Sequence, residues 1–264
     1  MELRVLAVGD VVGKNGLAFL EKRLRGLKRQ YNIDFCVVNG ENASVVGLTP
    51  EQAERMLDAG ADVITLGNHS LSHREICPFL DDCDRILRPA NWQPGLPGRG
   101  WGWFDTRYGE VVVVNLIGRC NMSYNADNPF RVIDPILEKA GKLPVLLDFH
   151  AEATSEKLAM GWYLDGKITA LWGTHTHVAT ADEQILPRGT GYITDLGMTG
   201  PRLSVIGTKP EQSVAMFRGE LTSRFETAQG PCMLCGAVFT VDPATRKCIS
   251  VERVRLDDEA AARG

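Results

Sequence analysis

Five segments of this 264-residue chain place acidic, amide or imidazole side chains directly after a short apolar run. These side chains belong to Asp10, Glu41, Asn42, Asn68, His69, His150, Glu152, His175 and His177. Carboxylate, amide oxygen and imidazole together suit divalent ions such as Mn, Fe or Zn, whereas Ca would take oxygens only and structural Zn would take thiolates. The residue types therefore indicate a catalytic metal centre.

The His-x-His pair suggests that this centre holds two ions. His175 and His177 are two residues apart, and in an extended segment such residues point to the same side with backbones roughly 6.5 Å apart. From that span each imidazole could reach one of two ions about 3.5 to 4 Å apart. The spacing favours a binuclear centre.

Each of these residues also has a simpler interpretation. Asp10 could be a helix N-cap, and Asn42 or Asn68 could make a turn. A lone histidine at a strand end is more often a hydrogen-bonded structural residue than a ligand. Because the whole set falls at strand ends, a shared metal site explains it better than five unrelated turns.

The apolar runs alternate with amphipathic helical stretches, a pattern typical of α/β units. Since the carboxyl ends of parallel strands lie at one edge of a sheet, the polar side chains are expected to meet there. Strands are predicted at 4–8, 33–38, 62–66, 111–116, 144–149, 168–172 and 192–194. Helices are predicted at 17–30, 49–60, 74–80, 132–141 and 154–163. Hairpins are predicted from 103–108 with 110–116, and from 237–241 with 248–254.

Local signals support some of these elements. Thr49, Pro50 and Gln52 form a helix start, with a threonine N-cap, a proline at the first helical position and a glutamine three residues after the cap. Residues 89–102 and 197–212 are expected to be long irregular loops, and loops of this length are usually functional or mobile.

Composition describes an ordinary globular chain. Hydrophobic residues make up 44%, and 29 basic residues against 33 acidic ones give a net charge of −4. We therefore expect one domain over 1–264, with 258–264 a frayed tail, and no surface that coats nucleic acid, although the composition permits a local basic cleft. Seven cysteines, an N-terminus unlike a signal peptide and no apolar stretch of roughly 18 residues predict a cytoplasmic protein with reduced thiols and no membrane span.

Several further residues receive a structural interpretation. The motif from Gly9 to Gly13 is not a dinucleotide-binding turn, because it lacks the G-x-G-x-x-G spacing. Cys232 and Cys235 have metal-ligand spacing but no second pair, so they are expected to be a buried structural pair.

Roles are also predicted for one histidine, one aspartate and two tryptophans. His73 is expected to be a helix cap or an exposed residue. Asp148 shares the strand face of His150 and is expected to orient a ligand imidazole. Trp101 and Trp103 could stack on a base, although packing within a hairpin is the commoner role.

Six segments resemble one known family. They are GDVVGKNG at 9–16, NGENA at 39–43, GNH at 67–69, DFHAEATSEK at 148–157, GTHTHV at 173–178 and GMTGP at 197–201. Together, and in this order, they resemble the YmdB-like bacterial metallophosphoesterases of the calcineurin-like superfamily. The resemblance implies an α/β fold in which a β-sandwich of mixed sheets is flanked by helices. It also implies two metal ions, often iron or manganese, and hydrolysis of phosphodiesters that include 2′,3′-cyclic nucleotides.

The resemblance also implies a role for each site residue. One ion would be held by Asp10, Glu41, Asn42 and His177. The other would be held by Glu41, Asn68, His150 and His175, with Glu41 bridging the two. His69 would donate a proton to the leaving group. The usual Asp-x-His of the superfamily is here Asp10-Val-Val12, and Glu41 stands where an aspartate usually bridges.

The expected reaction is attack of a metal-activated hydroxide on phosphorus, with His69 protonating the departing ribose oxygen. The expected partner is a small phosphodiester or cyclic nucleotide, with RNA ends as a further candidate and homo-oligomers left open. Two alternatives stay open: a phosphomonoesterase or nuclease on the same centre, and a metal-dependent nucleotide-binding regulator with little turnover.

Overall fold

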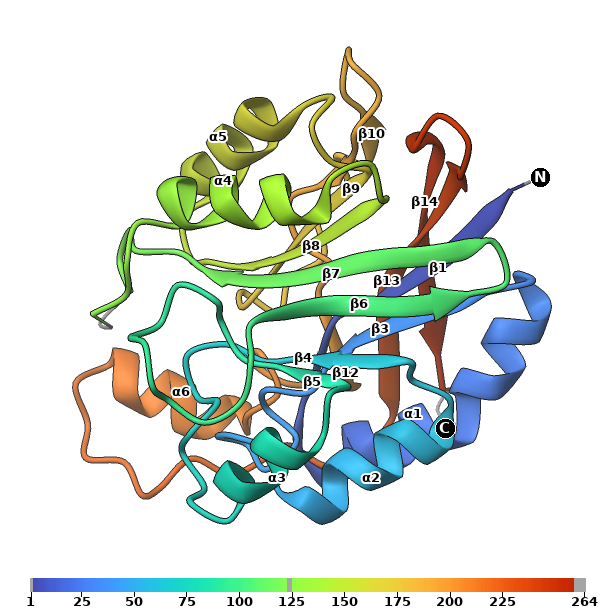
Figure 1. Cartoon of the computed structure of the whole chain (residues 1–264). Coiled ribbons are helices and arrows are strands. Elements are labelled where there is room, and N and C mark those ends of the chain that lie inside the picture. The colour runs from blue at the N-terminus through green and yellow to red at the C-terminus, as the bar shows by residue number, and fades with distance from the viewer. Residues whose placement is uncertain (1, 123–124, 259–264) are drawn as a thin grey trace.

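Two β-sheets packed face to face form the centre of the molecule, as seen in a computed structural model that describes residues 2–122 and 125–258 (Figure 1). The first sheet has the order β2 (Asp10–Val11), β12 (Met198–Pro201), β13 (Cys232–Asp242), β1 (Leu3–Val8), β3 (Phe35–Asn39), β4 (Val63–Thr65) and β5 (Ile86–Leu87), with β14 (Lys247–Asp257) paired to β13. The second has the order β10 (Gln184–Ile185), β11 (Gly191–Ile193), β9 (Ala170–Thr174), β8 (Val145–His150), β7 (Gly109–Ile117) and β6 (Trp101–Thr106).

Helices cover the outer face of each sheet. The first sheet packs against α1 (Gly13–Gln30), α2 (Pro50–Ala59) and α3 (Ile76–Asp82). The second packs against α4 (Pro129–Ala140) and α5 (Thr154–Leu164), which lie on the opposite side of the molecule in Figure 1. The last helix, α6 (Pro210–Phe217), stands beside the loops at one end. The predicted sandwich of mixed sheets flanked by helices is confirmed.

Strand alternation decides which side chains face the space between the sheets. In β1, Leu3, Val5 and Ala7 belong to the core between the sheets, whereas Leu6 and Val8 pack on the helices. In β8, Leu146 faces the same inner core. Because side chains alternate with a period of two, Asp148 and His150 follow Leu146 onto the inner face.

All the predicted strands, helices and hairpins are present, with ends shifted by a few residues. The predicted start of α2 is confirmed as a capping box: Thr49 Oγ1 accepts from Gln52 N at 3.3 Å, and Gln52 Oε1 accepts from Thr49 N at 3.1 Å.

The prediction of an irregular 197–212 was wrong in part. This stretch contains β12 and the start of α6. The strand has only four residues and includes a glycine and a proline, so its residues show no strand pattern. It is held by pairing with β2 and β13. The buried residue of α6 is Ser213, so this helix has no apolar stripe from which it could be predicted.

The cysteines are free thiols, including the pair Cys232 and Cys235. Both lie in β13 and both are buried, as predicted; an odd spacing in a strand turns their side chains to opposite faces.

The first residue of the predicted frayed tail is held by the sheet. The backbone N–H of Asp258 donates to Cys232 O at 2.8 Å. The rest of the predicted tail, 259–264, lies outside the described residues. Within the described chain, no helix combines the length and the apolar character that a membrane crossing requires.

Candidate metal centre

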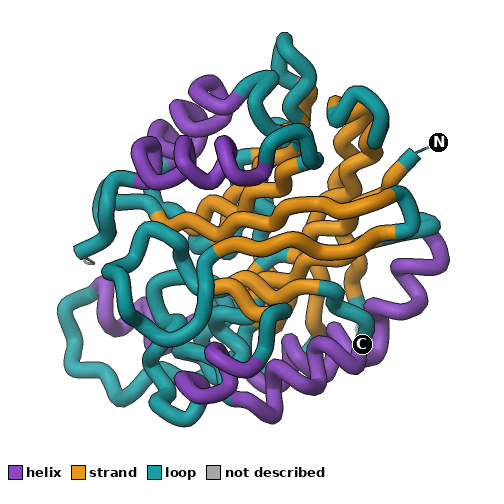
Figure 2. The backbone as a smooth tube through the Cα atoms, in the orientation of Figure 1, coloured by secondary structure: helices purple, strands orange, loops and turns teal. Residues whose placement is uncertain are grey.

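The predicted ligands meet at one end of the sandwich, where the loops gather on the left of Figure 2. β1, β3 and β4 run parallel in the first sheet, and β7, β8 and β9 run parallel in the second, so their carboxyl ends share this end. Asp10, Glu41 and His150 are completely buried there, and Asn42 and Asn68 nearly so. The sequence predicted one sheet edge, whereas the structure builds the site from the edges of two sheets.

Three atoms with lone pairs converge on the Nε2 atom of His150. Asn68 Oδ1 lies at 3.0 Å, Glu41 Oε1 at 3.1 Å and His175 Nδ1 at 3.1 Å. A single ring N–H could serve only one of them. Ligands that share one ion at about 2.1 Å in an octahedral arrangement lie about 3 Å apart. The distances therefore suit a cation among these four atoms.

The orientation of His150 is set through its other ring nitrogen. Thr174 Oγ1 donates to Asp148 Oδ1 at 2.7 Å and lies 2.9 Å from His150 Nδ1, from which it can accept. The proton is thereby assigned to Nδ1, which leaves the lone pair of Nε2 for a metal. The predicted orienting role of Asp148 is consistent with this geometry, although it acts through a threonine rather than directly.

Asp148 also ties the two sheets together beneath the site. Its Oδ2 accepts from Thr65 Oγ1 at 2.5 Å and from Asn39 Nδ2 at 3.1 Å, and both donors belong to the first sheet. Burial raises the pKa of Asp148 to about 6, against the hydrogen bonds from Thr65, Thr174 and Asn39 that lower it. The same Asn39 accepts from the backbone N–H of Glu41 at 3.1 Å, which positions the next ligand.

A second group surrounds the Nε2 atom of His177. Asp10 Oδ1 lies 3.7 Å away, and the amide group of Asn42 lies 3.0 Å away. His177 Nδ1 donates to the backbone oxygen of Ile206 at 2.8 Å, so Nε2 carries the lone pair. The Asn42 amide is assigned with its nitrogen toward the ring, and a rotation about its last bond presents the oxygen instead. These groups match the ligands that the resemblance assigns to one ion.

The buried carboxylates of Asp10 and Glu41 leave the site with negative charge that a bound cation would neutralise. In the part of the chain that the structure describes, Asp10 Oδ1 and Glu41 Oε2 are buried without a hydrogen-bond donor, and Glu41 Oε1 has only the ring nitrogen Nε2 of His150 nearby, at 3.1 Å. Burying an ionised carboxylate is costly unless a positive charge compensates it. Burial lowers the pKa of His150, but the nearby carboxylates of Glu41, Asp10 and Asp148 outweigh it and raise that pKa to about 9.

The pKa values of the neighbouring Asp10 and His175 are both lowered, in contrast to that of His150. Burial alone would raise the pKa of Asp10, yet the positive charges of the nearby His177 and His150 hold it below its usual range. Burial and the charge of His150 lower the pKa of His175 to about 3, so this imidazole stays neutral and able to ligate.

Carboxylate and imidazole groups alone do not complete an ion site. Among residues 2–122 and 125–258, no three or more His, Cys, Asp or Glu side chains are arranged to hold an ion. The donor sets that the resemblance implies also include the amides of Asn42 and Asn68, which lie 3.0 Å from His177 Nε2 and His150 Nε2 respectively. The buried unpaired oxygens and the mixed nitrogen and oxygen donors nevertheless fit the divalent ions expected from the sequence.

The extended geometry predicted for His175 and His177 was wrong. β9 ends at Thr174, and the two histidines have φ angles of 96° and 64°, in the left-handed region. As a result His175 turns toward His150 while His177 turns toward Asp10, so the two rings serve different groups of ligands. His175 Nε2 also lies 3.2 Å from Glu152 Oε2.

A buried ion pair supports this bend, and the sequence did not indicate it. Lys157 Nζ lies 2.7 Å from Asp195 Oδ2, and both side chains are buried. Asp195 Oδ2 also accepts from Thr176 Oγ1 at 2.8 Å and Thr176 N at 3.3 Å, between the two histidines. The sequence signal that could have indicated this pair is Lys157, a lysine on the inward side of a predicted helix, within the segment DFHAEATSEK.

Gly67 allows the ligands to approach one another. A Cβ atom at this position would lie 2.3 Å from His150 Nε2 and 2.4 Å from Glu41 Oε2. His69, two residues later, is half-buried, and no hydrogen bond or ion pair joins its imidazole to the cluster within the described chain. His69 therefore lies near the ligands because it follows Asn68 in the chain, and not because a described contact holds its imidazole there.

A cavity of about 810 Å³ opens next to the second ligand group. Gly13 and Ala43 line it, and Gly13 N donates to Asn42 O at 2.9 Å, which ties the cavity wall to a ligand. Lys14, Phe225 and His73 also line it. His73 is thus half-buried in a cavity wall, and Glu75 rather than His73 is the N-cap of α3, so neither predicted role of His73 holds.

Comparison with known proteins identifies the family of this chain. The family model described as YmdB-like protein matches residues 6–254. The chain is 43% identical to the 2′,3′-cyclic-nucleotide 2′-phosphodiesterase of Bacillus subtilis (strain 168), over 97% of this chain and 98% of that one. Among solved structures it resembles a novel phosphatase from Mycoplasma pneumoniae (TM-score 0.92, 34% identity, 97% and 94% of the two chains). It also resembles a hypothetical protein from Thermus thermophilus (TM-score 0.90, 36% identity, 97% and 100%).

Proposed function

The chain belongs to the YmdB-like protein family, and from this premise we propose that its metal centre hydrolyses phosphodiesters, with 2′,3′-cyclic nucleotides as the main substrates. The observation that carries the proposal is the set of buried carboxylate oxygens on Asp10 and Glu41, of which Asp10 Oδ1 and Glu41 Oε2 have no hydrogen-bond donor among the described residues. They converge with imidazole and amide groups at the carboxyl ends of the strands. Such a set is suited to binding cations that in turn bind phosphate.

The ligands divide into two groups that share Glu41. Asp10, Asn42 and His177 would hold one ion with Glu41, and Asn68, His150 and His175 would hold the other. When bound, such ions lower the pKa of water and stabilise charge on phosphoryl oxygens. The nitrogen and oxygen donors suit Mn, Fe or Zn, and of these we propose iron or manganese, as the family resemblance implies.

The chain itself supplies the proton and the orientation. His150 is held by Thr174 with its Nε2 lone pair toward the ions, so its ring needs no rearrangement when they bind. His69 follows the ligand Asn68, and its imidazole is not engaged in a hydrogen bond within the described chain. We assign His69 as the general acid that protonates the departing ribose oxygen.

The cavity beside Asn42 is the proposed place for the nucleoside. Phe225 offers a ring face for the base, and Lys14 offers a positive charge near the phosphate. At about 810 Å³ the cavity has room for a nucleoside. An RNA end that carries a 2′,3′-cyclic phosphate presents the same chemical group.

The test is hydrolysis by purified protein loaded with Mn or Fe. We expect turnover of bis-p-nitrophenyl phosphate and of 2′,3′-cyclic AMP. His69→Ala should lose turnover by about 10²- to 10⁴-fold and keep its metal content. His73→Ala is the matched control: it should leave bis-p-nitrophenyl phosphate turnover unchanged and raise the KM for the cyclic nucleotide only. Full activity of His69→Ala towards 2′,3′-cyclic AMP, whose departing ribose oxygen needs the proton, would falsify the acid role.

The alternative activities give different results in the same assay. A phosphomonoesterase would prefer p-nitrophenyl phosphate to its diester, and a nuclease would cleave a linear dinucleotide faster than the cyclic nucleotide. A regulator would bind the cyclic nucleotide and release it intact. Metal analysis of the same preparation identifies the ion.

A further inference from the structure

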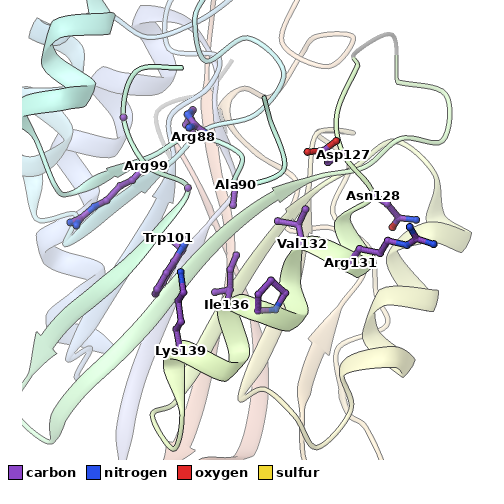
Figure 3. A pocket seen from close by; sticks show the side chains of 13 residues that line it. Arg88, Ala90, Arg99, Trp101, Asp127, Asn128, Arg131, Val132, Ile136 and Lys139 are labelled. Carbon is purple, nitrogen blue, oxygen red and sulfur yellow. The ribbon is translucent and has the colours of Figure 1, made fainter. Parts of the chain in front are cut away.

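A second cavity lies outside the metal centre, between helix α4 and the loop that follows β5 (Figure 3). Its volume is about 720 Å³, within the range that holds a nucleotide-sized ligand. The residues that line it include none of the proposed metal ligands, nor His69.

The lining of this cavity is positively charged although the chain as a whole carries −4. Arg88, Arg131 and Lys139 contribute positive charge, Arg99 is paired with Asp84 at 3.2 Å, and Asp127 is the one acidic residue among the described lining side chains. Arg131 and Lys139 are exposed on α4, and no carboxylate pairs with either within the described chain. Such uncompensated cations attract an anionic ligand.

One of the arginines is rigidly placed. Arg88 is buried, and its guanidinium donates to the backbone oxygens of Pro97 at 3.0 Å and Pro89 at 2.8 Å. No carboxylate forms an ion pair with it in the described chain. Its charge is therefore a fixed feature of the cavity wall rather than a mobile surface group.

The same cavity offers an aromatic surface. Trp101 lines it, with Lys139 Nζ 5.8 Å from the centre of the indole ring. Figure 3 shows Trp101 and Lys139 on one side, Arg131 on the other, and Val132 and Ile136 between them. Planar apolar surface flanked by cations suits a ligand that joins a base to a phosphate.

The cavity is next to the metal centre along both sheets. Asn115 Nδ2 donates to Leu87 O at 2.8 Å and to Leu66 O at 2.6 Å, which ties the start of the cavity loop to the strand end before Asn68. Asn91 Nδ2, in the same loop, donates to Ile117 O at 2.8 Å, and Ile117 is the strand partner of His150. These hydrogen bonds anchor the cavity loop to the strand ends that precede Asn68 and that pair with His150.

We propose that the cavity between α4 and the loop after β5 binds a nucleotide unit, its base against Trp101 and its phosphate between Arg131 and Lys139. The unit belongs to a single-stranded RNA whose end lies in the metal centre; this choice of source rests on the proposed function. A free nucleotide offers the same base and phosphate, and the two sources are separated by the experiment.

The experiment measures binding without turnover. A fluorescently labelled RNA hexamer and AMP are titrated into the full chain in EDTA, the hexamer by fluorescence anisotropy and AMP by calorimetry. The test variant is Arg131→Glu/Lys139→Glu. The control is Lys22→Glu/Lys142→Glu, which makes the same change in charge at exposed positions outside the cavity. Trp101→Ala tests the stacking surface.

The test variant should bind the hexamer at least tenfold more weakly, while the control stays within twofold of wild type. The slope of log affinity against log salt should fall by about 1.4, because each phosphate contact with a single strand contributes about 0.7. Trp101→Ala should weaken binding about 5- to 150-fold. All three variants should hydrolyse bis-p-nitrophenyl phosphate at the wild-type rate.

The outcomes are distinct. Hexamer binding much tighter than AMP binding, with both sensitive to the test variant, supports an RNA strand; equal affinities with the same sensitivity support the cavity with a free nucleotide as its ligand. A test variant that binds both probes as well as the control overturns the proposal. Because binding is measured without metal, an inactive wild-type enzyme would count against the proposed function and not against this site.

Discussion

Replacing Gly67 by alanine tests whether the close approach of the ligands is required. The added methyl carbon would lie 2.3 Å from His150 Nε2 and 2.4 Å from Glu41 Oε2. Ordinary contacts between such atoms are about 3.5 Å, so the ligands or the strand end must move by about 1 Å. A displacement of that size costs about 10²-fold in rate, while overpacking costs about 1–3 kcal/mol of stability.

The assay compares this variant with Gly26→Ala. Gly26 is exposed within α1, and a Cβ there has no neighbour within 4 Å, so alanine should stabilise the protein by about 0.5–1 kcal/mol and leave activity unchanged. Gly67→Ala should remain folded by circular dichroism, unfold a few degrees lower, bind less metal and turn over bis-p-nitrophenyl phosphate about 100-fold more slowly. Wild-type turnover with full metal content in Gly67→Ala would refute the reasoning.

Three further predictions concern the groups that support the site and the thiols. Thr174→Val removes the hydroxyl that fixes the His150 ring and should weaken metal affinity about 10- to 100-fold by titration, whereas Thr174→Ser, which keeps the hydroxyl, should stay near wild type. Lys157→Met leaves the buried Asp195 without its counter-ion and should lower the free energy of unfolding in urea by about 3–5 kcal/mol; an unchanged midpoint would show that the pair is not needed for stability. Burial raises the pKa of Cys36 to about 12, so iodoacetamide at pH 8 should leave it unmodified in the native protein and label it after unfolding, as peptide mass spectrometry would show.

Much of the fold could be predicted because its signals are local. Short, continuous apolar runs predicted the central strands, and Thr49 with Gln52 predicted the start of α2. β12 escaped prediction because it is held by pairing with β2 and β13, which lie far from it in the chain, and α6 escaped because its buried residue is Ser213 and it has no apolar stripe.

The candidate ligands could be predicted for a related reason. A charged or imidazole group at the end of a buried strand is costly to bury unless it is paired, hydrogen-bonded or bound to a metal, so its residue type alone points to such a partner. The bend at His175 and His177 could not be predicted in this way, since it depends on Asp195, whose contact with Lys157 spans 38 residues of sequence.

The sequence by itself determined which chemical groups stand at the strand ends, and strand alternation determined that Asp148 and His150 share one face. Only the tertiary structure decided that two sheets supply the site, that Thr174 connects those two residues, and that Asn39 reaches Asp148 across 109 residues. The physical reason is that residue type and periodicity are local properties of the chain. Which groups meet, and which buried charges remain without a partner, depends on how the sheets pack.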